Sequence, residues 1–458
     1  MHNTFEESLI KNSKLPSSWQ SKESRDELET FLQMNWSQRD SFYRDVHYES
    51  KQQFLDFRKD SIRTNNYVGT IVFKGEQINI FPKMFKVDKD DHDADDLSLS
   101  FLMRNLSIWI EYCNKIDYPY ISFKGEVEHC DNLKELFIVV FIKYLKNAME
   151  RSAFYQYEEK TEDCSSIKGK FDIKDYFIKK IPNGNTNKFR CSYSEFVFDN
   201  LLNQIIKYTC NTILPDTCGR NQKELRIVIS KLNDVTDVKC VPSDCDKIRL
   251  SRMNNHYKII ISMCKLFLLN KSTTYNVDKT DSFCFLFPTE VLFEGFIGGF
   301  IQSVVDHETK VRLQASDMTL FDEIVHGQKA YGAAFVMRHD ILLEKNKKIF
   351  ILDTKYKELP RFNNSTKSEY VSAINTGDLY QMYTYASRRG VNDVYLLYPL
   401  FNGEEIDEET KMLSSRAFGD IGKEQKMMVH VVRLPFVFED DINKTKSQLK
   451  DIIDSLIS

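Results

Sequence analysis

Hydrophobic positions change their spacing along the chain. Residues 1–60 are rich in polar residues, and two stretches within them place apolar residues at helical intervals, which predicts a helical or loosely ordered lead-in. From Tyr67 to Phe81, β-branched and aromatic residues alternate on both sides of a Lys-Gly-Glu turn, a pattern typical of a β-hairpin. The chain is therefore expected to pass from helical segments into a small sheet.

Helical spacing returns after this hairpin. Five stretches carry apolar residues every three to four positions, at 97–116, 133–154, 193–214, 223–234 and 256–270. Residues 165–190 interrupt them with strand-like pieces at 171–173 and 176–181. A polar stretch at 270–282 breaks the helical pattern and predicts a linker. We therefore expect an α+β amino-terminal domain, of β-hairpin elements plus helices, over residues 61–275.

The residues after the linker alternate between the two patterns. Helical spacing at 291–305, 376–390 and 440–457 is interleaved with strand-like runs at 332–344, 347–359, 391–401 and 426–438. Helices that alternate with strands in this way pack on the faces of a sheet. The sequence predicts an α/β domain over residues 283–458, with a central mixed sheet flanked by helices.

Composition and charge narrow the class of partner. The chain has 458 residues, 42% of them hydrophobic and 28% charged, which excludes a mainly disordered or fibrous protein. Its 63 Lys and Arg against 67 Asp and Glu give a formal charge of -4, so a contact with nucleic acid must be a local patch. Residues 168–190 are locally basic, and their candidate contact residues are Lys168, Lys170, Lys179, Lys180, Lys188 and Arg190. This segment is either a solvated hairpin or a surface that meets phosphates or an acidic partner.

Export and membrane signals are not found. The first residues lack a basic segment followed by an apolar one, and no stretch approaches about 20 uninterrupted apolar residues. We expect a cytoplasmic protein that contacts no membrane. The ten cysteines are scattered without a C-x-x-C pair, which favours reduced thiols. Cys240 and Cys245 with His256 lack a fourth ligand at a convincing spacing, so the sequence does not favour a metal site there.

Three charged residues in the second half suit phosphodiester chemistry. Asp340 lies in one predicted strand, and Asp353 and Lys355 lie at the end of the next. A hairpin would set Asp340 across from Asp353, and side-chain alternation puts Asp353 and Lys355 on one face. Paired carboxylates suit Mg²⁺, with Mn²⁺ as an alternative, and Lys355 can orient a water or neutralise negative charge. The same residues also fit an ordinary cross-strand charge pair.

Further residues are candidates for the same site. Gln381 and Tyr385 are one turn apart on the same face of a predicted helix. Glu294 is either a further acidic metal ligand or the polar side of an amphipathic helix. The apolar run at 349–352 favours a site at Asp353, because open α/β sheets bind ligands at the carboxyl ends of buried strands.

The order of these segments resembles the McrC family, the endonuclease subunits of McrBC-type modification-dependent restriction systems, which carry a PD-(D/E)xK nuclease domain. Over about 285–435 the resemblance rests on FPTEVLFEGFI, RHD, ILDTKYK, DLYQMYTYA and VYLLYP. Upstream it continues in NYVGTIVFKGEQINIFPKMF, KGKFDI and CSYSEFVFDNLLNQIIK. The family often has Pro before its first acidic residue, where this chain has His339.

The resemblance assigns roles to the candidate residues. It implies that Asp340 is the first acid of the nuclease motif and that Asp353 and Lys355 are its D-x-K. Gln381 and Tyr385 correspond to a QxxxY element associated with such nucleases.

The resemblance also implies a function and a partner. It implies a Mg²⁺-dependent endonuclease that cuts modified double-stranded DNA. The implied partner is a McrB-like AAA+ ring that hydrolyses GTP or ATP, and the endonuclease stimulates this hydrolysis. The chain has no G-x4-G-K-[ST] motif, so we expect it to bind no nucleotide and to dock on the ring through residues 61–275. Two other functions stay open: a stand-alone DNA repair or recombination nuclease, and a non-catalytic activator of a AAA+ motor.

Overall fold

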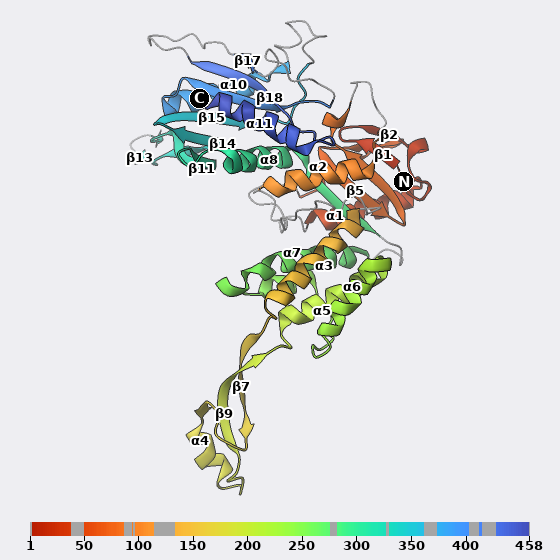
Figure 1. Cartoon of the computed structure of the whole chain (residues 1–458), viewed down its shortest axis with the longest axis vertical. Coiled ribbons are helices and arrows are strands. Elements are labelled where there is room, and N and C mark those ends of the chain that lie inside the picture. The colour runs from red at the N-terminus through yellow and green to blue at the C-terminus, as the bar shows by residue number, and fades with distance from the viewer. Residues whose placement is uncertain are drawn as a thin grey trace. The chain divides into compact units, whose positions relative to one another are not determined.

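The chain has a mixed α+β fold of two compact units (Figure 1). Unit 1 consists of residues 1–131 and 277–458, and unit 2 of residues 132–276. Unit 2 is therefore an insertion in the sequence of unit 1, whereas the sequence predicted consecutive domains at 61–275 and 283–458. The computed structural model describes residues 2–37, 50–86, 94, 97–113, 133–274, 282–326, 329–360, 373–402, 412–414 and 427–457.

Unit 1 contains a four-stranded sheet made from distant segments. Its strand order is β1 (His2–Phe5), β6 (Glu76–Phe81), β5 (Tyr67–Phe73) and β10 (Phe283–Pro288). The predicted hairpin is present as β5 and β6, which pair antiparallel. β10 pairs antiparallel with β5, with Cys284 opposite Ile71. The predicted start of the second domain is thus an edge strand of the first sheet.

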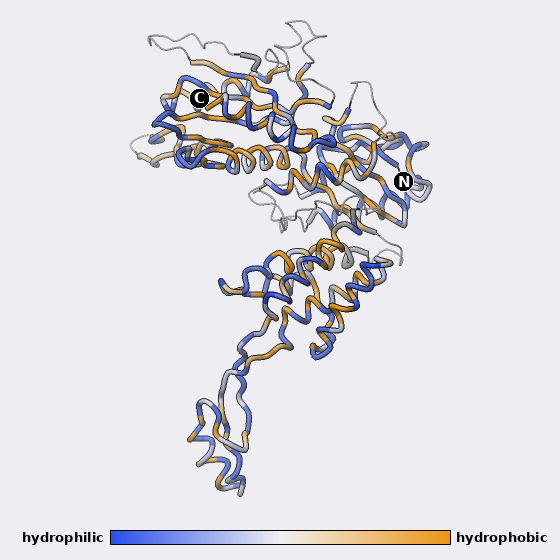
Figure 2. The backbone as a smooth tube through the Cα atoms, viewed as in Figure 1, coloured by the Kyte–Doolittle hydropathy of each residue, from blue (hydrophilic) through white to orange (hydrophobic). Residues whose placement is uncertain are grey.

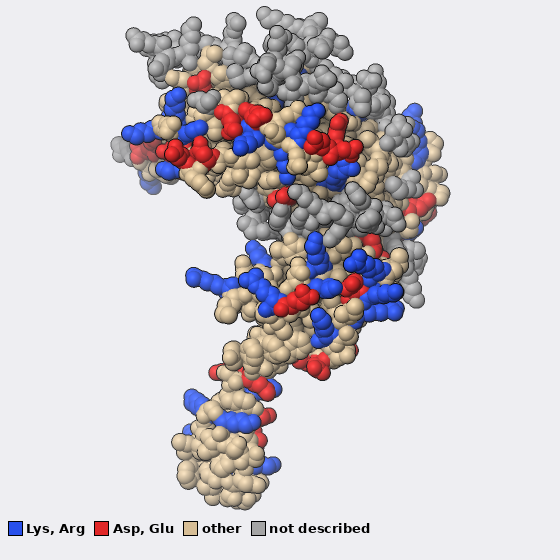
Figure 3. Space-filling model, viewed as in Figure 1, with Lys and Arg blue, Asp and Glu red and all other residues tan. Residues whose placement is uncertain are grey.

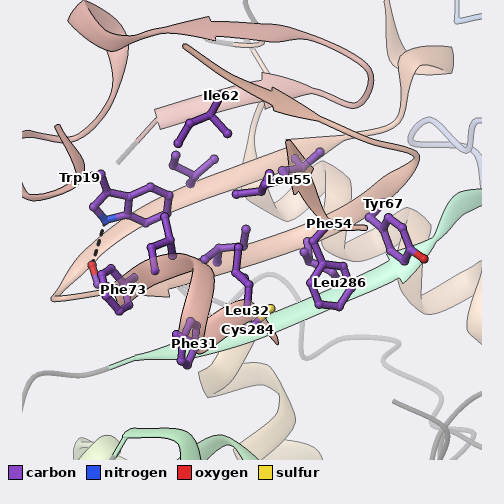
Figure 4. Close-up of a cluster of buried hydrophobic side chains, with 14 of the residues drawn as sticks. Trp19, Phe31, Leu32, Phe54, Leu55, Ile62, Tyr67, Phe73, Cys284 and Leu286 are labelled. Carbon is purple, nitrogen blue, oxygen red and sulfur yellow. Dashed lines mark hydrogen bonds between the residues drawn. The ribbon is translucent and has the colours of Figure 1, made fainter. Parts of the chain in front are cut away.

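The first 60 residues are an integral part of unit 1. They supply helix α1 (Lys22–Ser37) and, with β4 (Ser61–Thr64), the three-stranded sheet of β2 (Leu9–Lys11), β4 and β3 (Leu55–Phe57). Trp19, Phe31, Trp36 and Phe54 are buried with Phe73 in one hydrophobic cluster (Figure 4). Trp19 Nε1 donates a hydrogen bond to the Phe73 carbonyl oxygen at 3.1 Å. The helical prediction is confirmed for α1, but strands of three or four residues are too short to show a period.

Unit 1 also contains a six-stranded mixed sheet. Its order is β11 (Lys310–Phe321), β14 (Ala334–Lys345), β15 (Lys348–Thr354), β16 (Asp393–Pro399), β18 (Met428–Leu434) and β17 (Met412–Ser414). β15, β16 and β18 are parallel, and the other neighbours pair antiparallel. The predicted mixed sheet is confirmed. β11 was not predicted, because a shift of register between Ala315 and Met318 interrupts its alternation.

Helices cover both faces of this sheet. α10 (Thr376–Arg389) packs on one face, where Met382 joins Val394 and Leu396 in a buried cluster. Tyr395 points to the opposite face, where its hydroxyl donates to the Leu456 carbonyl oxygen of α11 (Ile442–Leu456). α8 (Thr289–Val304) contacts α11, β14 and β15, and it is predominantly hydrophobic in Figure 2. α2 (Leu99–Tyr112) lies against α8.

Unit 2 is a helical body with a projecting arm. The body contains α3 (Leu133–Arg151), α5 (Leu201–Ile213), α6 (Gly219–Lys231) and α7 (Lys258–Thr274). We define the arm as residues 156–197. In it, β7 (Gln156–Cys164) and β9 (Phe189–Val197) pair antiparallel, with β8 (Lys170–Phe171) against β9. The short helix α4 (Ile173–Asp175) and a helical turn over Tyr176–Lys180 form the arm's far end (Figure 1).

Three local predictions in unit 2 need correction. Residues 176–181 were predicted as strand-like, but Tyr176–Lys180 is helical. The predicted helix at 193–214 begins only at Leu201, because the Asn200 side chain caps it and the preceding residues pair in β9. The first residues of the predicted linker at 270–282 are helical, since α7 continues to Thr274. Residues 275–281 lie outside the described part of the chain. No helix of the described residues is long and apolar enough to cross a membrane.

Candidate active site

Asp340 and Asp353 face each other across the hairpin of β14 and β15. The ladder ends with Ile341 paired to Leu352, so Asp340 and Asp353 occupy the next position of the same register. Asp340 Oδ2 accepts two hydrogen bonds from Thr354, one from its backbone N–H and one from its hydroxyl, both at 2.9 Å. The juxtaposition predicted from strand alternation is therefore present, and Thr354 fixes the orientation of Asp340.

Asp353 carries its carboxyl group in the interior of the protein. Only 1% of the residue is exposed, and its strand runs between β14 and β16. Burial and the nearby Asp340 carboxylate raise the pKa of Asp353 to about 7, although the Lys355 ammonium opposes the change. Asp353 is therefore an acid whose ionised form needs a positive charge next to it.

Lys355 supplies positive charge from the end of the same strand. Its Nζ lies 2.6 Å from Asp353 Oδ2 and 3.9 Å from Asp378 Oδ1. Burial disfavours the ammonium, but the carboxylates of Asp353, Asp378 and Asp340 outweigh it and raise the pKa of Lys355. The Lys355 backbone N–H donates to the Leu397 carbonyl oxygen at 2.8 Å, which ties this position to β16.

Helix α10 brings an amide and a phenol to the same place. Lys355 Nζ donates to Gln381 Oε1 at 3.3 Å, and Gln381 Nε2 donates to the Tyr385 hydroxyl at 2.8 Å. Tyr385 in turn donates to the Arg338 carbonyl oxygen of β14 at 2.7 Å. The predicted pair of α10 residues is thus joined by hydrogen bonds to Lys355 and, through the Lys355 ion pair, to Asp353.

Glu294 reaches Asp340 through a residue that the sequence did not indicate. Gln314 Nε2 donates to Glu294 Oε1 and, at 3.3 Å, to Asp340 Oδ1. Gln314 lies in β11 just before the shift of register and has a φ of 51°, a conformation that is uncommon for a non-glycine residue. No sequence signal marks Gln314, because its role depends on this irregularity in β11.

Asp378 is a second residue that the sequence did not indicate. It is 9% exposed, lies in the first turn of α10, and its Oδ2 is 2.7 Å from Lys357 Nζ. With Lys355 at 3.9 Å, Asp378 holds both lysines that follow β15. The sequence does carry one signal for Asp378: it is an acid in the first turn of the predicted helix, one turn before Gln381.

Two carboxylates of this site could hold a metal ion. Among the residues that the structure describes, no three or more His, Cys, Asp or Glu side chains are grouped so as to hold a metal ion. Asp340 and Asp353 are a pair, with Lys355 as the adjacent cation and Glu294 behind Gln314. The arrangement is that of a small acidic site with one fixed positive charge.

Comparison with known proteins adds the family. The model of the McrBC 5-methylcytosine restriction system component family matches residues 62–399. The chain belongs to the McrBC family. No curated protein sequence matches it significantly.

A solved McrBC assembly contains a chain with a similar fold. A chain from the refined half-complex of a tetradecameric assembly of Thermococcus gammatolerans McrB AAA+ hexamers with bound McrC has 17% sequence identity and a TM-score of 0.66, with 99% of each chain covered. A chain from the cryo-EM structure of the Thermococcus gammatolerans McrBC complex has 19% identity and a TM-score of 0.47, covering 67% of this chain and 88% of the other. The first of these similarities shows that the fold extends over almost the whole chain.

His339 occupies the position before the first acid in this McrBC-family chain. It is completely buried, its Nδ1 lies 3.2 Å from the Ala315 carbonyl oxygen, and its ring centroid is 4.3 Å from that of Tyr385. Burial lowers the pKa of His339, which favours the neutral ring. The His339 side chain packs β14 against β11 and α10. This packing role is filled here by histidine, at the position where the family often has proline.

The basic segment of the McrBC-family chain lies in the arm and is partly neutralised there. Lys180 forms an ion pair with Asp163, and Arg190 lies 3.8 Å from the same carboxylate. Lys179 Nζ is 3.0 Å from Asp175, and Lys168 Nζ lies over the Tyr193 ring. The positive charge of the segment therefore serves the arm's own structure in several places.

Apolar side chains are exposed at the far end of the same arm. Ile173, Phe177 and Ile178 are 58%, 63% and 59% exposed. Figure 3 shows mainly uncharged surface at this end of the arm. The segment predicted to make basic contacts thus presents a mixed surface of cations and large apolar side chains.

Proposed function

We propose that this chain is a Mg²⁺-dependent DNA endonuclease of the PD-(D/E)xK type and acts as the cutting subunit of a McrBC-like restriction complex. One observation carries the proposal: Asp340, Asp353, Lys355 and Gln381 meet at one end of a mixed sheet in a member of the McrBC family. A carboxylate pair with an adjacent lysine is an arrangement suited to metal-assisted phosphodiester hydrolysis.

The donor set fits a divalent cation. Mg²⁺ is commonly bound by one or two carboxylates, with water and substrate oxygens completing its octahedron. Burial and the repulsion from Asp340 raise the pKa of Asp353, and a cation shared with Asp340 would offset both effects. We therefore assign Asp340 and Asp353 as ligands of Mg²⁺, or of Mn²⁺. Glu294 would become a third acidic ligand when Gln314 moves aside.

The side chains around the acids have separate tasks. A cation held there would supply an acidified water and neutralise charge on the scissile phosphate. Lys355 orients the attacking water and balances the negative charge that develops on the phosphate. Gln381 holds the Lys355 ammonium in place, and Tyr385 fixes the Gln381 amide. Thr354 keeps the Asp340 carboxylate turned toward the site.

A ring partner completes the proposed complex. The structure with a TM-score of 0.66 contains McrB AAA+ hexamers with bound McrC. We propose that this chain likewise binds a McrB-like AAA+ ring that hydrolyses GTP or ATP and raises the hydrolysis rate of that ring. Because the chain has no G-x4-G-K-[ST] motif, nucleotide hydrolysis is assigned to the partner.

We assign docking on this partner to unit 2, through its arm. Exposed apolar side chains next to cations form a surface typical of protein interaction sites. Ile173, Phe177 and Ile178 supply the apolar part, and Lys168, Lys170, Lys179, Lys180, Lys188 and Arg190 supply the charged part.

The test is a cleavage assay with the purified partner. The full chain and the ring are mixed with 5-methylcytosine-containing or unmodified duplex DNA, Mg²⁺, and GTP or ATP. We expect cutting of the modified duplex that requires the partner, the nucleotide and Mg²⁺, and that is lost in Asp353→Ala. Asp393→Ala, on an exposed aspartate of the neighbouring strand β16, is the matched control.

The other outcomes separate the alternative functions. Cutting without the ring would identify a stand-alone nuclease. Stimulation of the ring without any cutting by the native chain would identify a non-catalytic activator and overturn the proposed chemistry.

A further inference from the structure

A carboxylate from the first strand of the chain is buried against the segment that carries the proposed active-site lysine. Glu6 directly follows β1, and its backbone N–H donates to the Phe81 carbonyl oxygen at 2.8 Å. The residue is 1% exposed. An ionisable group so deeply buried is costly unless donors surround it, so its partners decide its role.

Three donors from three segments meet this carboxylate. Glu6 Oε1 accepts from the Tyr356 hydroxyl at 2.5 Å and from the Lys83 backbone N–H at 2.9 Å. Glu6 Oε2 accepts from the Thr289 hydroxyl at 2.6 Å. Thr289 is the first residue of α8, the helix that carries Glu294. One carboxylate thus links the four-stranded sheet to two elements of the proposed active site.

Tyr356 is the critical partner because of its place in the sequence. It lies between Lys355 and Lys357, whose ammonium groups both approach Asp378 on the other side of the segment. Tyr356 itself is 5% exposed, with its ring beside Phe293. Residues 355–357 are therefore held on one side by α10 and on the other by the Glu6 carboxylate.

We propose that Glu6 is a positioning residue of the nuclease site, acting through Tyr356 to hold Lys355 against Asp353 and Gln381. The inference rests on the proposed function for its catalytic consequence, whereas the geometric link does not. Lys355 follows the end of β15, and beyond its own N–H bond to Leu397 the ladder no longer constrains the chain. The Glu6 to Tyr356 bond supplies the missing constraint. A shift of about 1 Å in a group that orients a nucleophile is enough to lower a rate substantially.

The test compares a variant that removes this bond with one that removes only the charge of its acceptor. Tyr356→Phe deletes the hydroxyl and keeps the ring in its apolar surroundings. Glu6→Gln keeps an acceptor oxygen for Tyr356 and Lys83, and its amide can donate to the Thr289 hydroxyl, so it tests the charge with little change in shape. Tyr257→Phe is the matched control, because the buried Tyr257 hydroxyl of unit 2 donates to the Ser152 carbonyl oxygen at 2.8 Å.

The first readout is cleavage by the full chain with its ring partner. Loss of one buried hydrogen bond that positions a catalytic group should lower kcat about tenfold in Tyr356→Phe, with KM for DNA nearly unchanged. Glu6→Gln should also lower kcat. The kcat of the double variant should be no lower than that of the more impaired single variant, since both changes act through one contact. Tyr257→Phe should retain the native kcat.

The second readout does not depend on cleavage. Hydrogen exchange is measured on a peptide spanning residues 353–358 of the full-length chain, where the amides of Lys355 and Lys357 are hydrogen-bonded. We expect faster exchange there in Tyr356→Phe and not in Tyr257→Phe. Unchanged exchange, or native kcat in a folded Tyr356→Phe protein, would overturn the positioning role. Faster exchange in Tyr356→Phe beside a native chain that never cuts DNA would instead overturn the proposed nuclease function and leave the link standing.

Discussion

The proposed active site of unit 1 and the arm of unit 2 depart from an ordinary globular protein in opposite ways. At the active site, charged groups are buried: Asp353 is 1% exposed and lies beside a second carboxylate. In the arm, apolar groups are exposed: Phe177 is 63% exposed at the far end. Each arrangement costs stability, because ions lose hydration in the interior and apolar surface is favoured by burial.

The difference indicates which kind of ligand each of the two regions suits. In the proposed function, the buried pair of acids binds a small divalent cation, which offsets their negative charge and can in turn bind a phosphate oxygen. An exposed set of isoleucine and phenylalanine side chains suits contact with another protein surface, which would remove it from water. Substitutions in the two regions should therefore separate DNA cutting from partner activation.

The largest expected effect is the loss of cutting in Asp353→Asn. Removal of a metal ligand should lower the cleavage rate by at least about 10³-fold while the chain still stimulates the NTPase of the ring. Rates of DNA cleavage and nucleotide hydrolysis are measured on the same complex, with Asp393→Asn as control. Persistent Mg²⁺-dependent cutting by Asp353→Asn would remove Asp353 from the catalytic set.

A large but incomplete loss is expected for Gln381→Ala. The amide positions Lys355 and is not assigned to the metal, so the cleavage rate should fall by roughly 10²-fold, less than for Asp353→Asn. Gln381→Glu would keep the shape and add a negative charge beside the Lys355 ammonium. The measurement is single-turnover cleavage. A loss in Gln381→Ala as complete as that of Asp353→Asn would assign the amide a direct part in the chemistry.

The arm should show the opposite pattern. Replacing Phe177 and Ile178 together by Ser removes two exposed apolar side chains and should weaken ring binding about tenfold or more, with little change in thermal stability. Met253, which is 86% exposed in unit 2 outside the arm, provides the control substitution Met253→Ser. Titration of the chain against the NTPase rate of the ring gives the affinity. Unaltered affinity in the double variant would move the docking surface away from the end of the arm.

Charge reversal along the arm gives a smaller effect that depends on salt. Changing Lys168, Lys170, Lys179 and Lys180 to Glu should weaken docking more at low ionic strength than at high, if the ring offers an acidic surface. Lys180 is already paired with Asp163, so its reversal also disturbs the arm itself. Lys168→Glu and Lys170→Glu alone are therefore the cleaner pair. Equal weakening at every salt concentration would point to a structural cause.

The smallest expected effect is on stability. Since the pKa of Asp353 is raised from 3.8 to about 7, the folded protein without divalent cations retains a proton that the unfolded chain releases between these values. The resulting stability is fully present below about pH 4 and is lost as the pH rises through 7. Asp353→Asn should therefore gain on the order of 1 kcal/mol over the native chain at pH 8, because the cost of burying the Asp353 charge and its repulsion with Asp340 both disappear.

Denaturant unfolding at pH 5 and pH 8, with a chelator present, measures this difference. Mg²⁺ added at pH 8 should narrow the gap by stabilising the native chain more than Asp353→Asn. A variant that is less stable than the native chain at pH 8 would mean that the Lys355 ion pair outweighs the repulsion.

Sequence alone predicted the part of the site that depends on local periodicity. The alternation of β14 and β15 places Asp340 opposite Asp353, and helical spacing places Gln381 beside Tyr385. Gln314 and Glu6 could not be found in this way. One depends on a local irregularity of β11, and the other reaches Tyr356 from 350 positions away. Assignment of such residues requires the packed structure.

The same distinction applies to the fold. The hairpin of β5 and β6 and the long amphipathic helices have repeating patterns, and the structure contains them. The predicted domain boundaries followed the polar stretch at 270–282, whereas β10 directly after it belongs to the sheet of β5. A linker in sequence marks a change of local structure, and pairing between distant strands decides which segments fold together.

The pairing of β10 with β5 has a consequence for how the protein is made. During translation, β5 leaves the ribosome long before β10, and all of unit 2 is synthesised between them. The sequence of unit 2 is complete before β10 is synthesised, so unit 2 can fold while the edge of β5 is still unpaired. Until β10 is synthesised, the edge of β5 has unpaired N–H and C=O groups. The apolar residues that pack against Cys284 and Leu286 of β10 also lack this part of their core. A nascent chain that pauses near residue 280 would therefore be a substrate for chaperones, with its middle folded and its first strands unfinished.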